Sequence, residues 1–214
     1  MQATQDTKPR WERRKDARPQ ELLAAALDQF VERGYAATRL EDVAKHAGVS
    51  KGTLYLYFTN KEELFKAVIR ETIVATIGEA EQDAAVFDGP SSELLRALLM
   101  RWWERICVTP IAGITKLMLV EGHHFPELVK FHNEEVVARG SALITGVLER
   151  GIASGEFRPV DPAIMTQVLI APVMMLMMWN RSIMPACEMP PVDPHAFLDT
   201  FISTTLVGLE APKP

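Results

Sequence analysis

The chain has 214 residues, which is enough to bury a core and allows one medium-sized domain or two small ones. Its formal net charge of −5 excludes a uniformly basic protein, but the charge is divided unevenly. Residues 1–61 carry 11 Lys and Arg against 8 Asp and Glu, whereas residues 62–214 carry 12 against 20. The first part can therefore approach DNA, and the second part would be repelled by it.

The two cysteines, Cys107 and Cys187, are too few and too far apart in the sequence for a disulfide framework or a zinc site. The N-terminal segment has no apolar core of the length that a secretion signal needs. We therefore predict a reduced, cytoplasmic protein.

Residues 1–17 are polar, and we predict a flexible N-terminal arm there. Its basic residues cluster just before Pro19: Lys8, Arg10, Arg13, Arg14 and Lys15. Such an arm can follow phosphates or enter a minor groove, and a plain solvated tail is the alternative.

The pattern becomes helical from Pro19 and ends at Gly34. The apolar residues of this segment recur at helical spacing: Leu22, Leu23, Ala26, Leu27, Phe30 and Val31. Tyr35 follows the terminal glycine, and we expect it to pack in the core. This helix is predicted to support the segment that comes next.

Residues 38–61 contain two further helix starts and the beginning of a third. Thr38 with Glu41 has the spacing of a capping box, Ser50 can cap the second helix, and Asn60 can cap the third. Gly48 can provide a left-handed turn between the first two helices. The segment is thus predicted to form a helix-turn-helix within a DNA-binding domain of residues 18–65.

The second of these helices has an outer surface suited to DNA, because Leu54 and Phe58 account for its buried side. The outer surface is basic, aromatic and able to form hydrogen bonds, and residues 43–60 contain no acid. One α-helix fits the major groove, with polar side chains on base edges and phosphates. The predicted DNA contacts are Thr38, Arg39, Ser50, Lys51, Gly52, Thr53, Tyr55, Tyr57 and Lys61.

Three stretches of this domain resemble the DNA-binding domain of TetR/AcrR-type repressors. They are residues 30–38 (FVERGYAAT), 43–58 (VAKHAGVSKGTLYLYF) and 61–65 (KEELF). The resemblance covers about residues 18–70. It implies double-stranded DNA as a partner, and a four-helix dimer interface made by the last two helices of two chains.

The remainder, residues 66–214, shows helical patterns and no sustained strand alternation, so the fold class is all-α. We expect about nine helices in total, with an N-terminal three-helix unit followed by a helical bundle. A helix from residue 61 to about residue 83 would link the two. Further helices are expected to begin near Ser91, Pro110 and Pro126.

The last two helices are predicted to open at Asp161 and Asp193, because each is an N-cap residue followed by proline. Residues 164–184 are apolar nearly all round. The most apolar run, residues 164–179, has about sixteen residues and is interrupted by Thr166, Gln167 and Pro172. It is short of the roughly 20 residues that a membrane span needs, so no membrane contact is predicted. Such a helix must be buried, which favours a homodimer through the last two helices.

Large adaptable apolar side chains are frequent in the second part, and as a group they favour a small hydrophobic effector. The predicted effector contacts are Trp102, Trp103, Ile106, Met118, Phe125, Phe131, Met165, Met174 and Met178. The alternative for any one of them is a place in the core or the interface.

We predict no metal and no cofactor. His123 and His124 invite a metal site, but adjacent helical residues diverge by about 100° and cannot easily share one ion. No phosphate-binding loop or nucleophile motif indicates an enzyme. The expected function is a dimeric repressor of a palindromic operator that a ligand releases. An activator and a protein-interaction module are the alternatives.

Overall fold

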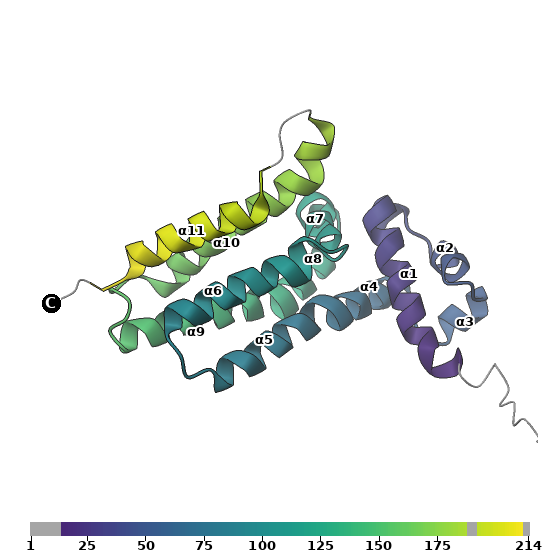
Figure 1. Ribbon diagram of the computed structural model, residues 1–214. Coiled ribbons are helices and arrows are strands. Elements are labelled where there is room, and N and C mark those ends of the chain that lie inside the picture. The colour runs from purple at the N-terminus through teal and green to yellow at the C-terminus, as the bar shows by residue number, and fades with distance from the viewer. Residues whose placement is uncertain (1–13, 188–191, 212–214) are drawn as a thin grey trace, which may run out of the picture. The chain divides into compact units, whose positions relative to one another are not determined.

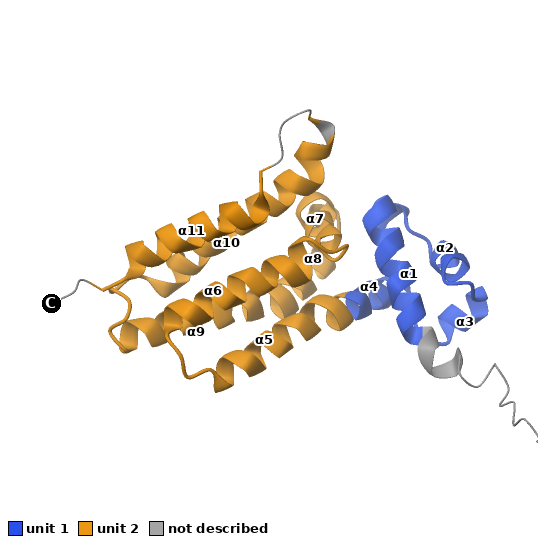
Figure 2. Cartoon of the chain, in the orientation of Figure 1, with its two compact units in different colours: residues 1–68 blue, residues 69–214 orange. Residues whose placement is uncertain are grey.

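The computed structural model describes residues 14–187 and 192–211, and these residues are almost entirely helical (Figure 1). When helical segments that follow one another directly are joined, they form nine helices, which confirms the all-α prediction. An isolated β-bridge joins Phe157 to Glu210. The chain divides into two compact units between Val68 and Ile69 (Figure 2).

The first unit contains α1 (Arg14–Ala37), α2 (Leu40–His46), α3 (Lys51–Tyr55) and most of α4 (Lys61–Ile69). The expected end of the first helix at Gly34 is confirmed, because Gly34 has a φ of 81° and breaks the helical backbone there.

The first helix begins earlier than we predicted. The arm was predicted to extend to residue 17, but residues 14–17 belong to α1. Residues 14–17 include Arg, Lys and Ala, which are good helix formers, and Pro19 lies inside the helix instead of at its start. The rest of the predicted arm, residues 1–13, lies outside the described residues.

The second unit continues directly from α4 through a π-helical segment, Arg70–Val74, into α5. Three more π-helical segments follow α6, α8 and α10, at Trp103–Cys107, Asn133–Val137 and Trp179–Ile183. The α-helices of this unit are α5 (Ala75–Val86), α6 (Ser91–Trp102), α7 (Ala112–Glu121), α8 (Pro126–His132), α9 (Ala138–Ala153), α10 (Pro162–Met178) and α11 (Pro194–Leu209).

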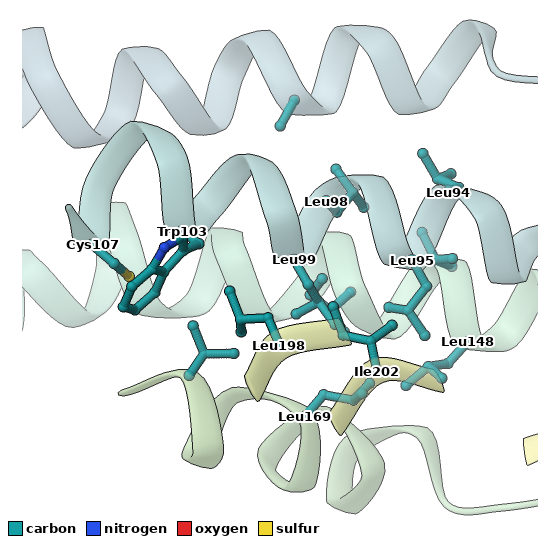
Figure 3. Packing of buried hydrophobic residues seen from close by; sticks show 14 of the residues in the cluster. Leu94, Leu95, Leu98, Leu99, Trp103, Cys107, Leu148, Leu169, Leu198 and Ile202 are labelled. Carbon is teal, nitrogen blue, oxygen red and sulfur yellow. The ribbon is translucent and has the colours of Figure 1, made fainter. Parts of the chain in front are cut away.

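The core of the second unit lies where α6 and α10 pack with α9 and where α11 closes over α6 and α10. Figure 3 shows Leu99 of α6 on the side of Ile202 of α11, whereas Leu94 and Leu98 lie on the other side of α6. Trp103 and Cys107 extend this cluster beyond α6. The leucines of α6 are therefore buried within this unit.

Both predicted proline-containing starts of the last helices are present. Asp161 accepts hydrogen bonds from the backbone N–H groups of Ala163 and Ile164, at 2.9 and 3.1 Å. Asp193 accepts one from the N–H of His195 at 3.0 Å. These caps supply acceptors for amides that have no partner within the first turn of a helix.

The apolar helix that begins at Pro162 is longer than the sequence indicated. It runs through the π-helical segment to Ile183, giving 22 residues, so the expectation that this apolar stretch is shorter than a membrane span was wrong. By length and composition alone, such a helix could cross a membrane. Only 28% of its most apolar window is buried within the chain, so most of its surface needs another explanation.

Glu156 joins the start of α6 to the end of α9. Its carboxylate accepts hydrogen bonds from the backbone N–H groups of Ser91 and Ser92, at 2.6 and 2.8 Å, and from the Ser92 hydroxyl. Burial alone would raise the pKa of Glu156, but the bonds from Ser92 and Ser91 outweigh it and lower the pKa. Arg150 completes the junction by donating to the carbonyls of Phe87 and Gly89.

The end of α9 leaves no room for a side chain at Gly151. A Cβ there would overlap the ring of Phe157, which is buried in the core. The Phe157 amide also donates to the Gly151 carbonyl at 2.9 Å, so the ring cannot easily move away. We predict that Gly151→Ala lowers the free energy of unfolding by about 1–3 kcal/mol through overpacking, as measured by urea denaturation.

Gly146 in the same helix provides the matched control. A Cβ at Gly146 would meet no atom within 4 Å, so Gly146→Ala should raise the free energy of unfolding by about 0.5–1 kcal/mol. Equal effects of the two substitutions would show that the contact between Gly151 and Phe157 is not tight.

Candidate nucleic-acid interface

Three aromatic rings hold α1 against α4 in the first unit. The ring centroid of Phe65 lies 5.0 Å from that of Phe30 and 5.2 Å from that of Tyr35, both in edge-on contact. Phe30 and Tyr35 stack at 5.7 Å. Tyr35 is buried, as predicted, and burial raises its pKa, with a further contribution from Glu62. This cluster gives the shorter helices a fixed base.

The link between α2 and α3 has the predicted turn. Gly48 has a φ of 66°, the left-handed conformation that favours glycine. Ser50 then caps α3, because its hydroxyl oxygen accepts from the Thr53 N–H at 3.1 Å. Leu54 is fully buried and anchors α3, so the direction of the remaining α3 side chains is determined.

The outer surface of α3 and its following turn contains most of the predicted DNA contacts. Lys51, Gly52, Tyr55 and Tyr57 are all exposed, and Thr53 is partly exposed. Leu56, which we did not include in the site, is 83% exposed between the two tyrosines. An apolar side chain at this position can contact sugars or thymine methyl groups.

Thr38 has a different role from the predicted one. Its hydroxyl donates to the carbonyls of Gln29 and Gly34, at 3.1 and 2.7 Å, and the residue is only 1% exposed. The N-cap residue of α2 is Arg39, and no side chain caps that helix. The capping box prediction was therefore wrong, and we leave Thr38 out of the DNA contacts because its side chain is buried against α1.

Lys61 was predicted to contact DNA, but its ammonium already has partners in the first unit. It donates to the carbonyls of Tyr35 and Ala36, at 2.6 and 3.2 Å, and lies 4.5 Å from the Tyr35 ring centroid. These contacts join the start of α4 to the end of α1. We therefore assign Lys61 a structural role and leave it out of the proposed DNA contacts.

The predicted cap of α4 is confirmed. The side-chain oxygen of Asn60 accepts from the Glu63 N–H at 2.8 Å. The Glu63 carboxylate in turn accepts from the N–H and hydroxyl of Thr59, at 3.0 and 2.5 Å. The hydrogen bonds from Thr59 lower the pKa of Glu63. This reciprocal arrangement fixes the turn between α3 and α4.

An ion pair that the sequence did not reveal connects α2 with α3. The ammonium of Lys51 lies 2.5 Å from a carboxylate oxygen of Glu41. The hydrogen bond from Lys51 lowers the pKa of Glu41, and the same bond raises the pKa of Lys51. Asp42, the next residue of α2, pairs with Arg33 at 3.2 Å.

The predicted effector residues all lie in the second unit, and they differ in how far they are buried. Trp103, Ile106, Met118 and Phe131 are buried. The others are partly buried: Trp102, Phe125, Met165, Met174 and Met178. All the partly buried residues except Phe125 pack against the core cluster. This agrees with the alternative that such residues have a place in the core. A place in the core and a contact with an effector are compatible, and these contacts stay predictions.

Two buried polar groups of the second unit were not predicted from the sequence. The Trp103 indole N–H and the Nε2 atom of His132 are buried without a hydrogen-bond partner among the described residues. His132 is 8% exposed, and burial lowers its pKa to about 4. The sequence showed no sign of these groups, because helical periodicity predicts which side chains are buried but not which hydrogen-bonding partners they have.

Comparison with protein families and solved structures follows the same two-part division. The model of the tetR family of bacterial regulatory proteins matches residues 22–68, and that of the tetracyclin repressor-like C-terminal domain matches residues 88–201. The chain belongs to the TetR family. It is a helix-turn-helix, DNA-binding transcriptional regulator, and the family is not enzymatic.

Relatives within the TetR family include the fatty acid metabolism regulator protein of Bacillus subtilis, 30% identical over 67% of this chain and 74% of that protein. The HTH-type transcriptional repressor KstR2 of Mycolicibacterium smegmatis is 30% identical over 67% of this chain and 69% of that protein. The crystal structure of FadR from Bacillus subtilis in complex with stearoyl-CoA has a TM-score of 0.75 at 24% identity. The structural match covers 89% of this chain and 99% of the FadR chain, and it shows that the two share a fold.

The buried imidazole of His132 predicts a loss of stability in acid. The unfolded chain takes up this proton near pH 6.5, whereas the folded chain resists it down to about pH 4. The contribution of neutral His132 to the free energy of unfolding is therefore present above pH 6.5 and is lost as the pH drops below that value. Between pH 7.5 and pH 5 we expect this group to cost about 2 kcal/mol of unfolding free energy, measured by urea denaturation.

His132→Leu should reduce the acid-induced loss by that amount, because leucine cannot be protonated. The exposed His124 supplies the control, and His124→Gln should leave the loss unchanged. If His132→Leu loses as much stability in acid as the wild type, the buried imidazole is not responsible.

Proposed function

We propose that this TetR-family regulator is a repressor that binds a palindromic operator as a homodimer in the cytoplasm. The observation that supports DNA reading most directly is the outer surface of α3. Its side chains stand on a helix capped by Ser50 and anchored by Leu54. A short rigid helix with exposed Lys51 and Thr53 at its start suits base edges in the major groove.

Dimerisation is supported by the exposed face of α10. Ile164, Val168, Ala171 and Met175 are all exposed and are spaced by four, three and four residues. This spacing places them on one side of the helix. In a single chain this apolar face is exposed to water, and a second copy of the chain would cover it.

The exposed face of α11 complements that of α10 in size. Its exposed residues are mostly small, and they include Ala196, Thr200, Thr204 and Gly208. Small side chains allow two helices to approach closely. Together the two faces support a four-helix interface, and they account for the exposed apolar surface of residues 162–183 without a membrane.

A hydrophobic effector with a polar group is the proposed ligand of the second unit. The buried Trp103 N–H and the buried His132 Nε2 are each a candidate partner for a polar group of such a ligand. The apolar side chains that cluster with Trp103 would hold its body. The related FadR was crystallised in complex with stearoyl-CoA. Long-chain acyl-CoA is therefore the first class of effector to test.

The effector would act through the helix that joins the units. α4, the π-helical segment Arg70–Val74 and α5 follow one another without a break. In a dimer, two first units that dock in successive major grooves must be about 34–36 Å apart. A ligand that favours a different spacing would release the operator, and a coupling of about 1–3 kcal/mol changes affinity about 5–150-fold.

Selection of bound duplexes from random sequence tests the proposal. We expect an enriched palindrome, and stearoyl-CoA should weaken its binding. Lys51→Ala and Thr53→Ala should change the preferred bases as well as the affinity. Lys130→Ala, which removes an exposed lysine of α8, should change neither.

The outcomes separate repression from the alternatives. Absence of any enriched sequence would favour a protein-interaction module. An enriched palindrome whose bases stay the same for Lys51→Ala and Thr53→Ala would remove α3 from base reading. Tighter operator binding with the effector, together with increased transcription, would indicate an activator.

A further inference from the structure

The ion pair between Glu41 and Lys51 lies at the candidate nucleic-acid interface itself. Glu41 is in the first turn of α2, and Lys51 is the first residue of α3. Their charged atoms are 2.5 Å apart, and both side chains are about half exposed. The Lys51 ammonium also lies 5.6 Å from the Tyr55 ring centroid. The lysine is therefore held among its neighbours on the surface where DNA would dock.

The pair changes the charge that this surface presents. Residues 43–60 contain no acid, and the sequence alone indicates a purely basic face. Folding brings the carboxylate of Glu41 onto Lys51 and makes the pair neutral. A phosphate that approaches Lys51 must displace the carboxylate, and it is repelled by the same carboxylate. A contact between Lys51 and a phosphate therefore adds little to the free energy of DNA binding.

A matching base pair in the major groove offers the two residues separate partners. Lysine donates to the O6 and N7 acceptors of guanine, and a glutamate accepts from the N4 amino group of cytosine. Both charges can be satisfied there at once, whereas a phosphate can satisfy only the lysine. The pair thus favours base contacts over backbone contacts.

We propose that Glu41 is a specificity-determining residue that pairs with Lys51 and thereby weakens binding to DNA without the operator sequence. This inference rests on the proposed function and adds a residue to its site. The contact is exposed, so it can open when a suitable base pair is present. Glu41 acts by positioning Lys51 and by competing for its charge.

Glu41→Gln tests this role in the full-length chain. Binding is measured by fluorescence anisotropy at several salt concentrations, on a random-sequence duplex and on the selected operator. Freed Lys51 should strengthen binding to the random duplex about two- to fivefold. It should also steepen the salt dependence on that duplex by about 0.9 in the log–log slope. Operator affinity should change less, so the ratio of the two affinities should fall.

Asp42→Asn is the matched control for loss of one negative charge. Asp42 is the adjacent residue on α2 and pairs with Arg33, so this variant leaves Lys51 held. It should leave the salt slope and the affinity ratio close to those of the wild type. Circular dichroism confirms that each variant is folded.

A double-mutant cycle with Lys51→Gln shows whether Glu41 acts through Lys51. In the Lys51→Gln background, Glu41→Gln should no longer strengthen binding to the random duplex. The proposal is overturned if the strengthening persists there, or if Glu41→Gln and Asp42→Asn have equal effects.

The same measurements distinguish a failure of the proposed function from a failure of the role of Glu41. If the wild type binds neither duplex, the proposed function and the role of Glu41 both fall. If the wild type prefers its operator but Glu41→Gln leaves the slope and the ratio unchanged, only the role of Glu41 is wrong.

Discussion

The exposed apolar face of α10 is the constraint on which the rest of the arrangement depends. This helix is apolar on the side that enters the core, with Leu169 and Val173, and also on the side that faces out, with Val168 and Met175. Apolar area left in water costs roughly 25 cal/mol per Å². One chain offers no described segment to cover the outer side, so a second copy is the simplest cover.

A pair of chains also explains how a small reading unit can be selective. α3 has five residues and can reach few bases by itself. Two copies related by a two-fold axis read two half-sites, which turns weak contacts into a specific site. The neutral pair of Glu41 and Lys51 fits this scheme, because a low affinity for arbitrary DNA raises the contrast with an operator.

Most helix caps set by residues close together in the sequence were predictable, and the capping box at Thr38 is the exception. The caps at Ser50, Asn60 and Asp161 depend on amides two or three residues away, and all three are present. The roles of Thr38 and Lys61 depend on carbonyls 4 to 26 residues away, which only the folded chain brings near. The partner of Lys51 was hidden for the same reason.

The most direct test of dimeric operator reading is the mass and operator affinity of Met175→Asp, by light scattering and anisotropy. Val86→Asp is the control, since Val86 is 83% exposed but lies on α5. We expect the wild type and Val86→Asp to be dimers that bind the operator. Met175→Asp should have half that mass and bind far more weakly. A wild type that is monomeric on its operator, or a Met175→Asp protein that binds like the wild type, would contradict the account.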